Sequence, residues 1–455
     1  MNTSTTVRDL LQNVAKRAGN YLDEAGQRRV APTPEAVAAL TQFTTTLPDR
    51  GQPAADILAQ LDEFGSPAST ITVGPRYFGF VTGGATPAAL AANWLAATWD
   101  QNSALHASAP ATAMLEQTAL DWLIDLFGLP QDCGGCFVTG ATVANFTVLA
   151  AARHRVLAQA GWDVEADGLF GAPSIDVLIG AESHPSVFKA LGLLGLGRER
   201  VIKVAVDEQG RMRADALPKI SGPTIVVTQV GNVNTGTSDP VGDICDRVAN
   251  TGAWVHVDGA FGLWAAACPS LNHLVAGVER ADSWATDAHK WLNVPYDNGI
   301  GIVRDPQALK AAMAVTAAYL PTAGELRNPS DYTPELSRRA RGVDVWAALL
   351  ALGRDGVADL VLRCCEHARE FARLLHAEGF EILNDVELNQ VMVSFGDDKR
   401  TRDVIAAVQR EGTCWAGVTH WQGKTAMRIS VSNWTTDVAD VQHSVDAITR
   451  AAQSL

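Results

Sequence analysis

The stretch TDAHKWLNVPYDNGIGIV, from Thr286 to Val303, places one lysine, Lys290, between two strand-like segments. The segment before it is ADSWATD (281–287), and the segment after it is GIGIVRD (299–305). A lysine held between two buried strands loses hydration, and a poorly hydrated amine is a better nucleophile. The sequence therefore presents Lys290 as a candidate nucleophile, whose electrophile has to be inferred from the rest of the chain.

Short apolar segments recur along the chain before this stretch and alternate with helical ones. They are CFVTG (136–140), SIDVLIG (174–180), VIKVAV (201–206), TIVVTQV (224–230) and WVHVDG (254–259). Several are apolar almost throughout, which is typical of strands that are covered on both faces. We therefore predict an α/β protein with a mainly parallel sheet between layers of helices.

The chain of 455 residues is too long for one ordinary domain. Residues 1–75 are polar and helix-periodic, and we expect an N-terminal helical segment that packs against a partner subunit. Residues 76–350 contain the alternating pattern and are predicted to form the large α/β domain. Residues 351–455 are predicted to form a smaller α+β domain, because a helix there precedes alternating strands.

Composition excludes several classes of partner. Lys plus Arg number 36 and Asp plus Glu 50, so the formal charge is 36 − 50 = −14, which argues against nucleic acid and anionic membranes. We find neither the apolar core of a signal peptide nor an uncharged apolar run of about 18 residues, so no membrane span is expected. Seven scattered cysteines indicate reduced thiols and a cytoplasmic protein.

Cys133 and Cys136 stand three residues apart in CGGC. Such a pair could be a redox site or half of a metal site. No second pair follows at metal-binding spacing, so we expect an ordinary Gly-rich turn and no metal.

Candidate functional residues follow the strands, because ligands of a parallel α/β sheet bind beyond the carboxyl ends of its strands. TGAT (139–142) opens an Ala-rich helix, whose free N–H groups and positive dipole end could seat a phosphate; an ordinary N-cap is the alternative. His184 follows the second strand in AESHPSV. Asp258 ends WVHVD and is poorly hydrated there, so it needs a cationic or N–H partner.

Together these positions suit pyridoxal phosphate. The phosphate takes the helix N-terminus, the acid keeps the pyridine nitrogen protonated, and the lysine forms an imine with the aldehyde. A dinucleotide-binding dehydrogenase is the alternative. It is disfavoured because no G-x-G-x-x-G motif opens a βα unit.

The sequence resembles the fold-type-I pyridoxal-phosphate enzymes, and within them the group II amino acid decarboxylases (aromatic amino acid, histidine, glutamate and cysteine sulfinate decarboxylases). The motifs are HVDGAFG (256–262), ADSWATDAHKWLNVPYD (281–297) and PELSRRARGVDVW (334–346), supported by PRYFGFVTGG (75–84) and GATVANFTVLAAAR (140–153). The resemblance implies an aspartate aminotransferase-like fold with a mainly parallel central sheet, an N-terminal helical arm and a smaller C-terminal α+β domain.

The resemblance also implies roles for individual residues. Lys290 matches the Schiff-base lysine, Asp258 the partner of the pyridine nitrogen, and His184 the imidazole stacked on the ring. The other cofactor contacts that it implies are Ala141, Thr142, Ala260, Asp287 and His289, with Asn234 and Thr235 from GNVNTGTSDP, a segment that departs from the family pattern.

A further residue bears on the reaction type. Relatives protonate the substrate carbon with a tyrosine on a loop from the neighbouring subunit, and Tyr319 stands at a similar spacing, 319 − 290 = 29 residues after Lys290. Tyr319 is therefore implied to be catalytic together with Lys290, His184 and Asp258. An aromatic residue that anchors a surface loop is the alternative. Relatives with phenylalanine there tend to make aldehydes, so tyrosine favours simple decarboxylation.

Two residues are candidates for substrate binding. Ser337 occupies a position that in relatives lines the pocket across the dimer interface. Arg428, in AMRISVSN, could hold a substrate carboxylate, although the alternation of the strand leaves open that it points to solvent.

We therefore predict a homodimeric, cytoplasmic, pyridoxal-phosphate-dependent carboxy-lyase with its active site at the subunit interface. It converts an L-amino acid to the amine and CO2 through the Lys290 Schiff base and a quinonoid intermediate. The alternatives are an oxidative decarboxylase-deaminase that forms an aldehyde, or a Cα–Cβ lyase or aldolase. An aminotransferase or a non-catalytic cofactor-binding protein is less expected, as are metal, nucleic-acid and membrane ligands.

Overall fold

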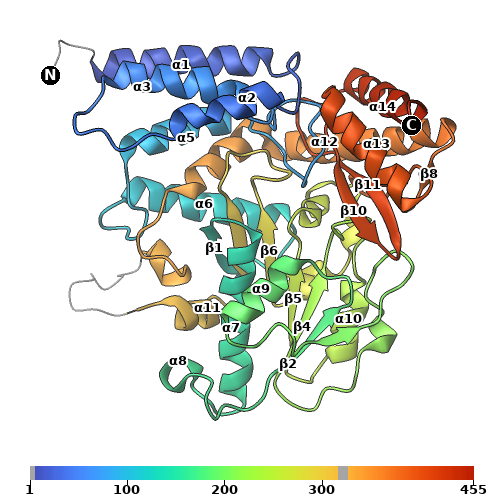
Figure 1. Cartoon of the computed structure of the whole chain (residues 1–455). Helices are drawn as coiled ribbons and strands as arrows, with labels where there is room; N and C mark the ends of the chain where they lie inside the picture. Colours follow the sequence, from blue (N-terminus) through green and yellow to red (C-terminus); the bar gives the residue numbers. More distant parts are fainter. Residues whose placement is uncertain (1–5, 316–325) are drawn as a thin grey trace.

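The computed structural model describes residues 6–315 and 326–455, which form helices around two β-sheets (Figure 1). The larger sheet has seven strands in the order β1-β7-β6-β5-β4-β2-β3. They are β1 (Gly134–Val138), β2 (Asp176–Gly180), β3 (Ile202–Val204), β4 (Thr224–Gln229), β5 (Trp254–Asp258), β6 (Ser283–Asp287) and β7 (Gly299–Val303). All neighbours pair in parallel except β7, which is antiparallel to both β1 and β6. The predicted mainly parallel sheet is confirmed.

Helices cover both faces of this sheet. Successive residues of β4 belong to two different hydrophobic cores. Ile225 and Val227 belong to the core that contains residues of helices α7, α9 and α11. Val226 belongs to the core on the other face, which contains residues of helices α6, α10 and α12. This period-two alternation is the geometry of a strand with two apolar faces. The helices are α6 (Pro110–Leu126), α7 (Ala141–Gln159), α8 (Val164–Asp167), α9 (Pro185–Leu193), α10 (Val241–Val248), α11 (Pro306–Met313) and α12 (Arg341–Ala377).

The CGGC stretch differs from its prediction, because Gly134 and Gly135 begin strand β1 instead of forming a turn. A side chain at Gly135 would collide with the carbonyl oxygen of Gly301 on the neighbouring β7, so the glycine allows the two strands to approach closely. Cys136 lies within the strand, where burial raises the pKa of its thiol to about 12. All seven cysteines are free.

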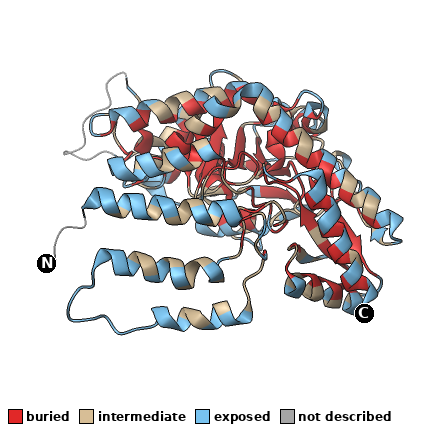
Figure 2. Cartoon of the chain, turned by 90° about the horizontal axis from the view of Figure 1, so that it is seen from above, coloured by how far each residue is buried: buried red, intermediate tan, exposed pale blue. Residues whose placement is uncertain are grey.

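The N-terminal helices form a separate layer beside the large sheet (Figure 1). They are α1 (Val7–Glu24), α2 (Pro34–Ala39), α3 (Ala54–Gln60), α4 (Ser66–Ala68) and α5 (Pro87–Trp99). A capping box starts α1, in which the Thr6 hydroxyl accepts the Asp9 N–H at 3.1 Å. Within the described part of the chain, helices α1 to α4 contain no buried residue, and Figure 2 shows the helices next to the N-terminus as exposed or intermediate.

The C-terminal part contains an antiparallel sheet in the order β10-β11-β9-β8. Its strands are β8 (Glu381–Ile382), β9 (Gln390–Ser394), β10 (Gly417–Trp421) and β11 (Lys424–Ser430), with helices α13 (Asp398–Glu411) and α14 (Val438–Gln453). Residue 350, the expected end of the large domain, lies inside α12, whose helical backbone is interrupted at Gly353 (φ 62°).

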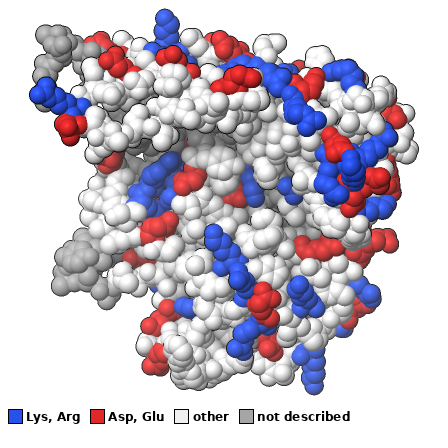
Figure 3. Space-filling model, viewed as in Figure 1, with Lys and Arg blue, Asp and Glu red and all other residues white. Residues whose placement is uncertain are grey.

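None of the helices in the described ranges is both long and apolar enough to cross a bilayer. Acidic and basic side chains are interspersed on the face shown in Figure 3.

Candidate active site

A cavity of about 460 Å³ lies at the carboxyl ends of the parallel strands. Its wall includes residues at the ends of β4, β5 and β6 and residues that follow β1 and β2. This is where ligands of parallel α/β sheets bind, and the volume suits a small molecule. Eight of the predicted cofactor residues line it: Ala141, Thr142, His184, Asp258, Ala260, Asp287, His289 and Lys290.

Lys290 is anchored by Asp287, which ends β6. The Lys290 Nζ lies 3.0 Å from Asp287 Oδ2, and the two side chains are 19% and 3% exposed. The other carboxylate oxygen, Oδ1, accepts the Ala141 N–H at 2.6 Å. Asp287 therefore connects the candidate nucleophile to the first turn of α7.

The N-terminus of α7 faces the cavity through Thr139, Gly140, Ala141 and Thr142. A side chain at Gly140 would approach His289 Cε1 to 3.3 Å, and one at Gly299 would collide with the Gly140 backbone. The missing side chain of Gly140 leaves this helix end accessible from the cavity, next to Asp287, which accepts the Ala141 N–H. An open helix N-terminus is a suitable seat for a phosphate.

Asp258 ends β5 and is 3% exposed. Burial raises the pKa of its carboxyl to about 6, against the lowering effect of the Lys290 ammonium and of a hydrogen bond from Asn145. The Asn145 Nδ2 donates to Oδ2 at 3.2 Å, and the Ala260 N–H donates to Oδ1 at 3.3 Å. These are the N–H partners that a buried aspartate requires.

His184 is the N-cap of α9 and is held by Ser186. Its Nδ1 lies 2.7 Å from Ser186 Oγ and accepts the Ser186 N–H at 3.2 Å. Burial, with further contributions from Lys290 and Arg428, lowers the pKa of His184 to about 4. The imidazole is therefore neutral near pH 7.

His289 is oriented by its own neighbours. Its Nδ1 accepts the Asn298 N–H at 3.0 Å, and its ring stacks on Tyr296 with centroids 4.2 Å apart. Burial lowers the pKa of His289, and the Asp287 carboxylate partly opposes this shift.

Arg428 lines the cavity, so its side chain is directed toward the site and not toward bulk solvent, the two orientations that the strand pattern left open. Its Nη1 donates to the carbonyl oxygen of Val233 at 3.1 Å. Burial lowers the pKa of its guanidinium, as expected for a cation that is largely removed from water.

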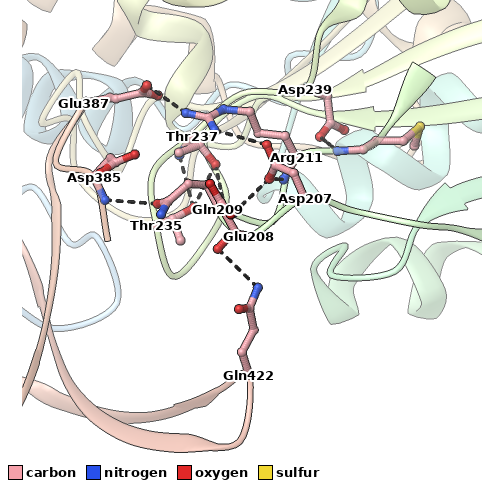
Figure 4. Close-up of polar contacts among 11 residues, drawn as sticks. Asp207, Glu208, Gln209, Arg211, Thr235, Thr237, Asp239, Asp385, Glu387 and Gln422 are labelled. Atoms are coloured by element: carbon pink, nitrogen blue, oxygen red, sulfur yellow. Dashed lines mark hydrogen bonds and ion pairs between the residues drawn. The ribbon is translucent and has the colours of Figure 1, made fainter. Parts of the chain in front are cut away.

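Asn234 and Thr235 are not brought to the cavity wall by the described part of the chain. The Asn234 Oδ1 accepts the Thr419 hydroxyl at 2.7 Å. The Thr235 hydroxyl donates to the carbonyl oxygen of Gln209 at 2.8 Å, within a polar cluster that also contains Asp207 and Thr237 (Figure 4). Both side chains thus have partners away from the cofactor residues.

Two other predicted residues have different positions. Ser337 is exposed, and it is not among the described residues of the single chain that line this cavity. Tyr319 belongs to residues 316–325, which lie outside the described residues.

Sequence reasoning missed several residues of the site. Ser186 stands two positions after His184 in HPS, where a hydroxyl at the first turn of a helix signals contact with the capping residue. Asn145 stands one helical turn after Ala141 in ATVAN, on the same helix face as that cavity residue. Gln229 and Phe261 also line the cavity, and Gln229 is the polar residue that ends the apolar strand TIVVTQ.

The residues present fit pyridoxal phosphate. The cavity combines a lysine amine for the aldehyde, a buried carboxylate for the pyridine nitrogen and a helix N-terminus for the phosphate.

Comparison with known proteins agrees with a site for pyridoxal phosphate. Residues 34–396 match the model of the pyridoxal-dependent decarboxylase conserved domain. Tryptophan decarboxylase 1 from Oryza sativa subsp. japonica is 25% identical over 94% of this chain and 90% of its own length. Aspartate 1-decarboxylase from Aliivibrio fischeri is 31% identical over 56% of this chain and 49% of its own length.

Solved structures show the same fold. The crystal structure of Oryza sativa TDC with PLP and tryptamine superposes with a TM-score of 0.91 at 22% identity, and the match covers 100% of this chain and 99% of that one. The predicted fold class, family and cofactor are confirmed. The match over residues 34–396 shows that the chain belongs to the pyridoxal-dependent decarboxylase family.

Proposed function

We propose that the protein decarboxylates an L-amino acid whose side chain carries an anionic group. The reaction, pyridoxal-phosphate-dependent removal of an α-carboxylate, is that of its family; the substrate class is our proposal. The observation that carries it is the position of Arg428, a guanidinium at the cavity wall.

No acidic side chain pairs with Arg428 in the ranges 6–315 and 326–455; its guanidinium donates to the Val233 carbonyl, and burial alone lowers its pKa. A partly buried cation without an anion favours binding one, and a guanidinium can bind a carboxylate through two hydrogen bonds. The α-carboxylate suits this role poorly, because its charge disperses as CO2 leaves and tight binding would stabilise the ground state. A side-chain acid keeps its charge throughout the reaction.

When bound, pyridoxal phosphate supplies an aldehyde and an electron-withdrawing ring that takes up the charge left by CO2. Lys290 holds the amine that reacts with the aldehyde, and Asp287, 3.0 Å away, orients that amine and is placed to accept its proton. Asp258 holds the proton of the pyridine nitrogen. His184, neutral near pH 7, presents a flat imidazole at the cavity wall.

We also propose that Tyr319 delivers the proton to the substrate carbon, so that the product is the amine and not the aldehyde. The spacing from Lys290 supports this role. Ser337, exposed in the single chain, is proposed to reach the cavity of a second subunit.

The exposed apolar residues of the N-terminal layer support a homodimer. Leu22, Leu61 and Trp94 are 42%, 53% and 41% exposed and line a groove between α1, α3 and α5. We propose that a second copy covers this groove, that residues 1–75 form the dimerisation segment, and that residues 76–350 and 351–455 form the large and small domains. Seven free thiols support a cytoplasmic location.

An aromatic amino acid is the second candidate substrate. Phe80 and Phe261 line the same cavity, and aromatic faces suit an aromatic side chain.

A substrate panel tests the proposal. The holoenzyme is incubated with aspartate, glutamate, cysteine sulfinate, tryptophan, tyrosine and DOPA while CO2, hydrogen peroxide and product mass are followed. We expect CO2 and the amine, without peroxide, from an acidic substrate. Turnover of aromatic substrates alone would overturn the substrate class, and aldehyde with peroxide would overturn the reaction.

Substitution of Arg428 sharpens this test. Arg428→Gln should raise KM for the acidic substrate by about tenfold or more, the size expected for a lost charge-assisted contact. Arg450→Gln removes a guanidinium that is 61% exposed and serves as the matched control. Equal KM values in all three proteins would contradict the role of Arg428.

A further inference from the structure

A line of buried polar side chains continues from Asp258 into the protein interior. Asn145 on α7, His256 on β5 and Ser283 on β6 are all 0% exposed, and Trp254 on β5 is 4% exposed. None of these four is among the residues that line the cavity. They connect the Asp258 side chain to the core through side-chain hydrogen bonds.

Four hydrogen bonds join the five residues. The Trp254 Nε1 donates to Ser283 Oγ at 2.8 Å, and Ser283 Oγ lies 2.9 Å from His256 Nδ1. The His256 Nε2 lies 2.8 Å from Asn145 Oδ1, and Asn145 Nδ2 donates to Asp258 Oδ2 at 3.2 Å.

The chemistry of the groups determines the direction of each bond. An indole N–H only donates, so Ser283 Oγ accepts from Trp254 and its own hydrogen is available to His256 Nδ1. An amide carbonyl only accepts, so His256 Nε2 carries a hydrogen and donates to Asn145. The reverse orientation of Asn145 would place its carbonyl against the Asp258 carboxylate.

The imidazole in this line is neutral. Burial lowers the pKa of His256 to about 3, and a backbone contact with Ser283 only partly opposes the shift. A neutral imidazole has one donor and one acceptor nitrogen, which matches the two contacts at His256. Every donor in the line therefore points toward Asp258, and bonds aligned in this way strengthen one another.

We infer that Asn145, His256 and Ser283 are positioning residues that hold Asp258 ionised and oriented toward the pyridine nitrogen of pyridoxal phosphate. The inference rests on the proposed role of Asp258. The line ends in a donor on Oδ2, and the Ala260 N–H occupies Oδ1, so both oxygens are held in place. Because the line is neutral, it stabilises the carboxylate without adding a charge that would compete with the cofactor.

The other charged groups near Asp258 are Lys290 and Asp287, which act in opposite directions: Lys290 lowers the pKa of Asp258 and Asp287 raises it. Neither belongs to the line. Variants of Asn145 or Ser283 thus change the support of Asp258 without removing a charge from the cavity.

The first measurement is the dissociation constant of pyridoxal phosphate, obtained by titrating the apoprotein. Asn145→Ala should weaken binding by about tenfold, as expected for a hydrogen bond to a charged group, and Ser283→Ala by a smaller factor because His256 and Asn145 remain. Ser283→Thr keeps the hydroxyl and should restore binding. Thr147→Val removes another buried hydroxyl of α7, one that donates to the Val143 carbonyl, and should leave binding unchanged.

The second measurement is the nitrogen-15 NMR shift of labelled pyridoxal phosphate in each folded variant. It reports whether the pyridine nitrogen is protonated, which loss of packing alone would not change. We expect Asn145→Ala to move the shift toward the unprotonated value, and Thr147→Val to leave it in place. Urea unfolding of the apoproteins identifies variants that are only less stable.

Asp258→Asn separates the two possible failures. If it leaves both the affinity and the shift unchanged, Asp258 is not the partner of the pyridine nitrogen and the proposed role fails. If Asp258→Asn changes them while folded Asn145→Ala and Ser283→Ala proteins match the wild type, the positioning role is overturned and the role of Asp258 stands.

Discussion

Lys290 Nζ lies 3.0 Å from Asp287 Oδ2, so the reactive amine is paired with a carboxylate that ends the strand directly before it. The same carboxylate accepts the Ala141 N–H at 2.6 Å. One aspartate thus positions both the lysine and the helix end proposed to bind the phosphate.

Asp287→Asn should slow the reaction of Lys290 with pyridoxal phosphate by about tenfold, since it removes a charge-assisted hydrogen bond to the amine. Stopped-flow absorbance of apoprotein mixed with the cofactor measures this rate. Asp246→Asn, at an exposed ion pair with Arg280, is the control. A wild-type rate for Asp287→Asn would contradict the positioning of the amine by Asp287.

Gly299→Ala should weaken cofactor binding and destabilise the protein by about 1–3 kcal/mol, because the new methyl group collides with the Gly140 backbone at the start of α7. Calorimetry of pyridoxal phosphate binding and urea unfolding measure the two effects. Gly222→Ala introduces a methyl group into open space and should change neither. A Gly299→Ala protein with wild-type affinity would show that α7 can shift without affecting the site.

Glu116→Gln should reduce the free energy of unfolding by about 3–5 kcal/mol, because it leaves a buried cation without its anion. Arg338 Nη1 lies 2.6 Å from Glu116 Oε2, and both side chains are 0% exposed. Glu411→Gln breaks the exposed pair with Arg450 and should cost less than about 1 kcal/mol. Equal losses in urea unfolding would contradict the distinction between the two pairs.

His184 should make stability depend on pH below neutrality. Its folded pKa, about 4, is lower than the ordinary value of 6.5, so the unfolded chain binds more protons between these values. The stabilising contribution is complete above about pH 6.5 and is lost as the pH falls toward 4; allowing for solvent screening, it is of order 2 kcal/mol. The free energy of unfolding of His184→Asn and of the wild type is measured from pH 7 to pH 4.5. We expect it to fall less steeply with decreasing pH in the variant. Parallel pH profiles would contradict the lowered pKa of His184.

Leu22→Asp combined with Trp94→Asp should convert the proposed dimer to monomers, because both side chains line the exposed apolar groove of the N-terminal layer. Light scattering over a range of concentrations measures the mass. Leu455→Asp, at another exposed leucine, is the control. A wild-type protein that is monomeric at micromolar concentrations, or a double variant that stays dimeric, would contradict the proposed interface.

The sequence by itself determined the class of fold and directed attention to the central residues of the candidate site. Apolar strands such as TIVVTQV are local patterns, and the rule that ligands bind at the ends of parallel strands directs attention to His184, Asp258 and Lys290 without knowledge of packing. Asp287 and His289 adjoin Lys290 in the chain, so they accompany it to the cavity.

Only the tertiary structure decided which side chains meet across elements. Asn145 on α7 contacts Asp258, 113 residues away in the chain, because α7 packs on the sheet in one rotation that no local periodicity specifies. Arg338, in the segment before α12, contacts Glu116 on α6, 222 residues away. The same packing turned Arg428 toward the cavity and gave Thr235 a partner elsewhere. A side chain's direction depends on which partners satisfy its hydrogen bonds once it is buried, and those partners come from distant parts of the chain.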